Sequence, residues 1–148
     1  MIHLLRVTAF NLPRSTRLSG ATLIVLVGVV HLWVFTHSTA PGYVIGLFLA
    51  ASVGSFLAVA GLLAGFRGVS WKLGAAISGL CFVGYVVSRA IGLPSFSAAV
   101  GAWHSPLGTV GLVLEALLLA LYVSLLVGWN VDAPGQRDWD TYFSLTRR

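Results

Sequence analysis

Four long apolar runs divide the chain, and they constrain its fold more than any other feature. We place them at residues 18–36, 43–66, 73–93 and 107–128. A helix needs about 20 mostly apolar residues to cross the hydrocarbon core of a bilayer. Only 9% of the residues are charged, against roughly 25% in a typical soluble domain. The sequence therefore predicts an all-α bundle of four transmembrane helices, in contact with membrane lipid.

Lys and Arg residues lie on alternate sides of the four runs. They occur before the first run, between the second and third, and after the fourth, at Arg6, Arg14, Arg17, Arg67, Lys72, Arg137, Arg147 and Arg148. The segments "HSTAPG" and "PSFSAAVGAWHSP" contain neither residue type. The positive-inside rule then predicts that both termini are cytoplasmic. Because the loops are short, we expect an antiparallel, up-down-up-down bundle.

The net charge of +5 also suits binding to nucleic acid, but the basic residues lie in short flanks of apolar runs. That placement fits membrane orientation better, so we expect no nucleic-acid partner. Several tryptophans fall near the predicted span boundaries, where amphipathic rings settle at the membrane surface: Trp33, Trp71, Trp103 and Trp129.

The first run also has features of a secretory signal, because three arginines precede it. Its apolar stretch is longer than a typical signal core, and Pro41 directly follows the possible cleavage position, so we favour a retained anchor. Residues 1–17 are then a basic cytoplasmic segment that could lie on the membrane as a short amphipathic helix. Residues 18–128 form the membrane domain, and residues 129–148 a cytoplasmic tail.

Small residues recur every four positions along the second run, at Gly42, Gly46, Ala50, Gly54 and Ala58. Residues four apart share a helix face. Such a stripe lets another backbone approach closely, on which helix packing in lipid depends. The partner could be a helix of this bundle or a separate subunit, and the sequence does not distinguish the two.

Three ionisable residues interrupt the spans: His31, Arg89 and Glu115. Each is costly to insert, and such residues usually face the bundle interior and pair. All three fall in the outer half, and the lean of helical side chains points Arg89 and Glu115 at each other. We therefore expect an Arg89–Glu115 ion pair with His31 nearby. Tyr85 and Ser88 share the helix face of Arg89 and belong to the same cluster.

The polar cluster has three interpretations: it fixes which helices meet, it binds a ligand, or Arg89 only extends to the outer surface. The candidate ligands are a proton, a quinone or lipid headgroup, a haem and a metal. A metal site made by His31, His37 and His104 is a weaker alternative, because no HxxxH or HExxH pair exists. The chain's only cysteine, Cys81, is expected to be a small apolar packing residue.

The segments "GVVHLWV", "YVVSRAIGLP" and "SPLGTVGLVLEALLLALY" resemble a group of small, uncharacterised four-helix membrane proteins of actinobacterial type. In that group a His in the first helix, an SRxxGLP segment ending the third and a Glu in the fourth recur. The matching positions here are His31, Ser88, Arg89, Gly92, Leu93, Pro94 and Glu115, within residues 20 to 127. The resemblance implies an integral protein of the bacterial cytoplasmic membrane and no assigned activity.

Hydrolytic motifs are lacking: there is no GxSxG, no Cys–His arrangement and no paired carboxylates. The leading prediction is a non-catalytic accessory or scaffold subunit of a larger membrane complex. The alternatives are a ligand or redox module that holds quinone, haem or metal, and a proton-coupled carrier in which Glu115 titrates.

Overall fold

The computed structural model describes residues 14–127, which form four long helices and one short turn of 3-10 helix. The elements are α2 (Arg14–His37), α3 (Gly42–Leu63), α4 (Arg67–Ala90), η1 (Ser97–Ala99) and α5 (Pro106–Leu126). All four long helices are sufficiently long and apolar to cross a membrane, and the described residues contain no β-strand. The prediction of an all-α fold with four helices long and apolar enough to span a membrane is confirmed. The predictions for the N-terminal segment and the tail lie on residues outside the described ones, apart from the start of α2.

Glycine follows two of the helices and proline begins another, as the backbone preferences of these residues predict. Gly65 (φ +92°) follows α3 and Gly92 (φ +87°) follows α4, both in the left-handed conformation that glycine adopts without strain. The Ser105 side chain accepts a hydrogen bond from the Gly108 N–H, and Pro106 occupies the first turn of α5.

The third helix is shifted toward the N-terminus relative to the predicted run. α4 begins at Arg67 rather than at residue 73, and it ends at Ala90 rather than at residue 93. The apolar run excludes Arg67 and Lys72, yet a helix continues readily through charged residues at a membrane surface. The run therefore marks the apolar part of α4 and not its full length.

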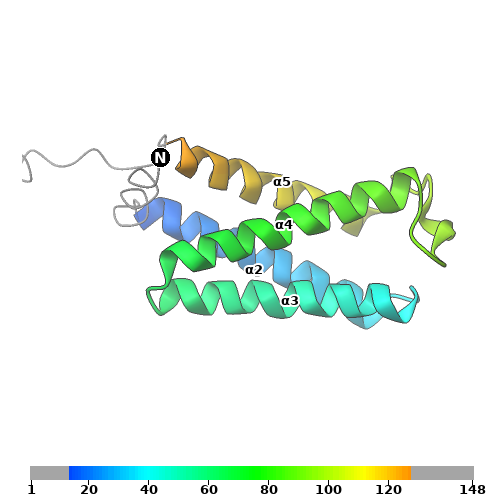
Figure 1. Cartoon of the computed structure of the whole chain (residues 1–148), viewed down its shortest axis with the longest axis horizontal. Helices are drawn as coiled ribbons and strands as arrows, with labels where there is room; N and C mark the ends of the chain where they lie inside the picture. Colours follow the sequence, from blue (N-terminus) through cyan, green and yellow to red (C-terminus); the bar gives the residue numbers. More distant parts are fainter. Residues whose placement is uncertain (1–13, 128–148) are drawn as a thin grey trace, which may run out of the picture.

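The helices lie lengthwise beside one another, and the main contacts join α2 with α3, α3 with α4, α4 with α5, and α5 with α2. Figure 1 shows residues 38–41 and 91–105 together at one end of the bundle, which we call the loop end. The turn at residues 64–66 lies at the opposite end, the turn end. α3 and α4 are close near the turn end and diverge toward the loop end (Figure 1).

The tightest packing lies toward the turn end. Its core combines one residue or more from each long helix: Ile24, Ala58, Trp71, Leu118 and Leu125. Trp71 is only 4% exposed, and a Cβ at Gly20 would lie 2.0 Å from its ring. Trp71 therefore faces the inside of the bundle rather than the membrane surface, because Gly20 of α2 leaves room for the indole.

Small residues bring α2 and α3 together. The Ser52 hydroxyl donates a hydrogen bond to the Gly28 carbonyl (3.0 Å), and a Cβ at Gly28 would lie 3.1 Å from Ser55. The predicted stripe on α3 only partly contacts the bundle. Ala58 is fully buried and Gly54 faces α4, whereas no atom lies within 4 Å of a Cβ placed at Gly42 or Gly46, and Ala50 is exposed.

Candidate functional site

A cavity of about 530 Å³ occupies the part of the bundle nearer the loop end. Residues of all four long helices line it, mostly with apolar side chains. Leu47 of α3 and Leu80 of α4 belong to this lining and are 60% and 75% exposed. One opening of the cavity therefore lies between α3 and α4, where these two helices diverge.

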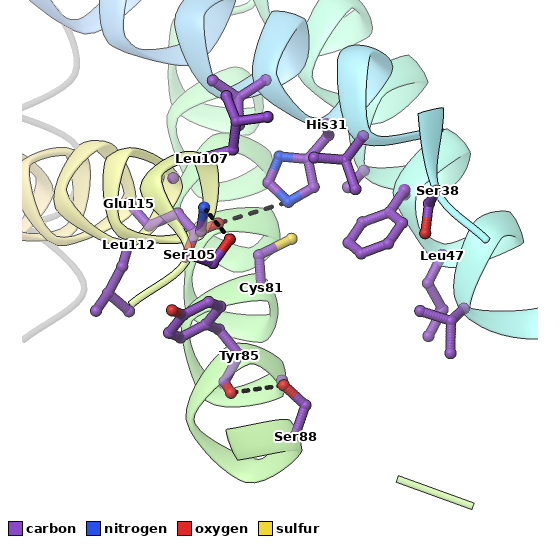
Figure 2. A pocket seen from close by; sticks show the side chains of 18 of the residues that line it. His31, Ser38, Leu47, Cys81, Tyr85, Ser88, Ser105, Leu107, Leu112 and Glu115 are labelled. Carbon is purple, nitrogen blue, oxygen red and sulfur yellow. Dashed lines mark hydrogen bonds and ion pairs between the residues drawn. The ribbon is translucent and has the colours of Figure 1, made fainter. Parts of the chain in front are cut away.

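His31 of α2 and Glu115 of α5 meet in this cavity from neighbouring helices. The His31 Nε2 lies 3.5 Å from the Glu115 Oε1, and the two residues are 7% and 3% exposed. The second carboxyl oxygen, Oε2, is buried and has no hydrogen-bond partner among the described residues. Figure 2 shows the imidazole of α2 and the carboxyl of α5 pointing toward each other.

The other ring nitrogen of His31 determines what this contact can be. The Nδ1 lies 2.8 Å from the Val27 carbonyl, which can only accept a hydrogen bond, so Nδ1 carries a proton. In a neutral imidazole the Nε2 is then an acceptor, and it faces a carboxyl oxygen that is also an acceptor. Two acceptors attract only through a positive species between them. With a neutral His31, the contact is therefore attractive only if a proton or a cation lies between the two atoms.

Cys81 is the third member of this group. One ligand atom from each of His31, Cys81 and Glu115 lies within 4.8 Å of the other two. In Figure 2 the sulfur on α4 points toward the imidazole. From the sequence, Cys81 is expected only to be a small packing residue. The signal that could have placed it here is its position one helical turn before Tyr85 on the polar face of α4.

Arg89 lies apart from Glu115. Its Nη1 donates a hydrogen bond to the Ala99 carbonyl (3.2 Å), and its guanidinium carbon lies 5.0 Å from the centroid of the Tyr85 ring. The structure pairs Glu115 with His31, and no Arg89–Glu115 ion pair forms in residues 14–127. The physical reason is position. Arg89 is next to the last residue of α4, so the segment after the helix offers it a nearer acceptor.

Tyr85 and Arg89 add unused donors to the cavity wall. The Tyr85 hydroxyl and the Arg89 Nε are both buried, and neither has an acceptor among the described residues. Ser88 is different, because its hydroxyl donates to the Tyr85 carbonyl (2.7 Å) within the helix. Of the predicted cluster, Tyr85 and Arg89 line the cavity and each keeps a buried donor without an acceptor in the described part of the chain, whereas the Ser88 hydroxyl is already used.

The three histidines proposed as a metal site are not assembled. His37 lies at the end of α2, stacked on Trp33 at 4.2 Å, and its Nδ1 lies 3.0 Å from the Trp33 carbonyl. His104 is exposed in the segment before α5. Only His31 faces the buried group, so a ligand set made of these three residues is not formed in the structure.

No protein family, curated protein or solved structure matches this chain.

Proposed function

We propose that this chain is a polytopic protein of the bacterial cytoplasmic membrane that binds a small amphipathic molecule of the quinone class in its cavity. The observation that carries this proposal is the pair of buried donors without acceptors, the Tyr85 hydroxyl and the Arg89 Nε. A buried donor without a partner costs about 1 to 3 kcal/mol. A ligand that brings carbonyl oxygens removes this cost at both groups.

The shape and lining of the cavity favour the same class of ligand. Its volume, about 530 Å³, lies in the range of roughly 300 to 1,000 Å³ typical of small-molecule sites. Most of the lining is apolar, and the polar residues are a minority that includes His31, Tyr85 and Arg89. A flat ring with two carbonyl oxygens and an apolar tail matches that distribution of groups.

The proposal includes an orientation in the membrane. The positive-inside rule puts Arg17, Arg67 and Lys72 on the cytoplasmic side, which makes the turn end cytoplasmic. The four helices then run up and down across the bilayer, both termini are cytoplasmic, and the cavity lies in the outer leaflet. We also propose that the chain is related to the actinobacterial four-helix group that it resembles.

Ligand binding is tested with the purified chain in detergent, titrated with a short-chain benzoquinone and followed by quenching of tryptophan fluorescence. Trp33 lines the cavity and serves as the reporter. We expect saturable binding at one site. Tyr85→Phe removes one hydrogen bond of about 0.5 to 1.5 kcal/mol, so the Kd should rise about two- to tenfold.

A matched pair of variants tests the opening between α3 and α4. Leu80→Phe enlarges a side chain at the opening, and Leu63→Phe makes the same change at an exposed residue that does not line the cavity. We expect slower or weaker binding only for Leu80→Phe. Quenching that never saturates, with identical curves for all variants, would show partition into the detergent and remove the proposal.

An accessory role in a larger complex is a second candidate, supported by one observation. The part of the α3 stripe at Gly42 and Gly46 contacts nothing in the described chain and could accept a helix of another subunit. Purification in mild detergent tests it. A subunit that co-purifies with the wild type and is lost from Gly46→Leu supports this role, whereas a monomer from native membranes contradicts it.

A further inference from the structure

We infer that His31, Cys81 and Glu115 form a binding site for a divalent cation of the zinc class at the buried side of the cavity. This inference does not depend on the proposed amphipathic ligand, because it uses a different set of atoms. The three side chains come from α2, α4 and α5 and converge on one point, as Figure 2 shows. Their ligand atoms all lie within 4.8 Å of one another.

The types of ligand atom match zinc. Imidazole nitrogen, thiolate sulfur and carboxylate oxygen are the three donors that bind Zn²⁺ in proteins. With Zn–N and Zn–O bonds of about 2.1 Å, tetrahedral geometry sets the N and O atoms about 3.4 Å apart. The His31 Nε2 and Glu115 Oε1 lie 3.5 Å apart. This separation is long for a hydrogen bond but fits two ligands of one ion.

The sulfur needs a modest adjustment. A Zn–S bond of about 2.3 Å sets the sulfur about 3.6 Å from the other two ligands. Because every separation here is 4.8 Å or less, the side chains must close by no more than about 1.2 Å. Three protein ligands leave a fourth position, and the cavity beside it has room for water or another small ligand.

His31 is already oriented as a metal ligand. Its Nδ1–H donates to the Val27 carbonyl, which leaves the lone pair of Nε2 directed at Glu115. A hydrogen bond from the second ring nitrogen to a carbonyl is the usual way in which proteins fix a metal-binding imidazole. The positive species required between the two acceptors is, in this inference, the metal ion.

The charges balance as a membrane interior requires. Metal binding forms S–Zn, N–Zn and O–Zn bonds and releases to solvent the Cys81 thiol proton and any proton held between His31 and Glu115. The ion carries two positive charges, the thiolate and the carboxylate one negative charge each, and the imidazole none. The bound group is therefore neutral. It also engages Glu115, whose Oε2 is otherwise buried without a partner.

Cobalt absorption tests the site. The purified chain is treated with EDTA, and Co²⁺ is added, because a cobalt–thiolate bond gives a charge-transfer band in the near ultraviolet. The chain has one cysteine, so the band can only come from Cys81. We expect one equivalent of Co²⁺ to bind and Zn²⁺ to displace it. Cys81→Ser should abolish the band, and His31→Gln or Glu115→Gln should weaken binding tenfold or more.

Two controls and a second measurement make the result decisive. His37→Gln and His104→Gln change exposed histidines and should leave the band unchanged. Zn²⁺ should also slow the reaction of a thiol reagent with the wild-type Cys81, which needs no variant to fold. No cobalt band and no protection by Zn²⁺ in the wild type overturn the inference. Quinone binding that persists after EDTA treatment shows that the quinone site does not require the metal site. The two proposals can then fail independently of each other.

Discussion

The pairing of Glu115 with His31 rather than with Arg89 gives the sharpest prediction. It is measured by two double-mutant cycles, each of which isolates the interaction between two residues. One cycle combines His31→Leu with Glu115→Leu, and the other combines Arg89→Leu with Glu115→Leu. The free energy of unfolding of each variant is obtained by SDS titration in mixed micelles.

The structure sets the expected magnitudes. Hydrogen bonds between helices in membrane proteins contribute about 0.6 kcal/mol on average and at most about 1.7 kcal/mol. Both His31 and Glu115 are more than nine-tenths buried, but their 3.5 Å separation is longer than a typical hydrogen bond, so we expect a coupling between these two values, about 1 kcal/mol. Arg89 bonds to Ala99 and not to Glu115, so that cycle should give less than about 0.5 kcal/mol.

The single variants provide an internal check. His31→Leu leaves the Glu115 carboxyl with no partner at all, so it should destabilise by about 1 to 3 kcal/mol. The double variant His31→Leu/Glu115→Leu removes the carboxyl together with the imidazole, so no unpaired carboxyl remains, and it should be less destabilised than His31→Leu alone. A coupling between Arg89 and Glu115 as large as that between His31 and Glu115 would refute the reasoning.

Four further substitutions test the packing and the helix ends, by the same unfolding measurement. Gly20→Ala puts a methyl group 2.0 Å from the Trp71 ring and should cost about 1 to 3 kcal/mol, whereas Gly46→Ala, with open space around it, should be neutral or stabilising. Ser52→Ala removes a buried hydrogen bond to α2 and should cost about 1 kcal/mol; an unchanged stability would mean that the bond does not form. Gly92→Ala forces a side chain into a left-handed conformation, so a loss of about 1 to 2 kcal/mol is expected, and no loss would contradict this helix end.

The sequence predicted the helices well because hydropathy depends on local composition alone. It predicted less about which side chains meet. Placing His31, Arg89 and Glu115 at similar depths was sufficient to gather them in one half of the bundle, but depth does not specify a partner. The partner of Arg89 is a backbone carbonyl at Ala99, in a segment that folds back after α4, and no side-chain pattern encodes that fold.

Cys81 also shows that the sequence does not specify which side chains meet. Its residue type and its apolar neighbours indicate packing, and its face of α4 is visible in the sequence. That it meets His31 and Glu115 depends on how α2, α4 and α5 rotate about their axes. Those rotations follow from contacts such as Trp71 on Gly20 and Ser52 on Gly28, each of which involves two distant segments.

The opening between α3 and α4 has a consequence for how occupancy should be measured. A molecule that enters between Leu47 and Leu80 arrives from the lipid rather than from water. The fraction of cavities that are occupied is then set by the mole fraction of the ligand in the leaflet, by mass action within that phase. Adding empty vesicles at a constant total amount of ligand should therefore dilute it and lower occupancy, although the concentrations of protein and ligand in the tube stay the same.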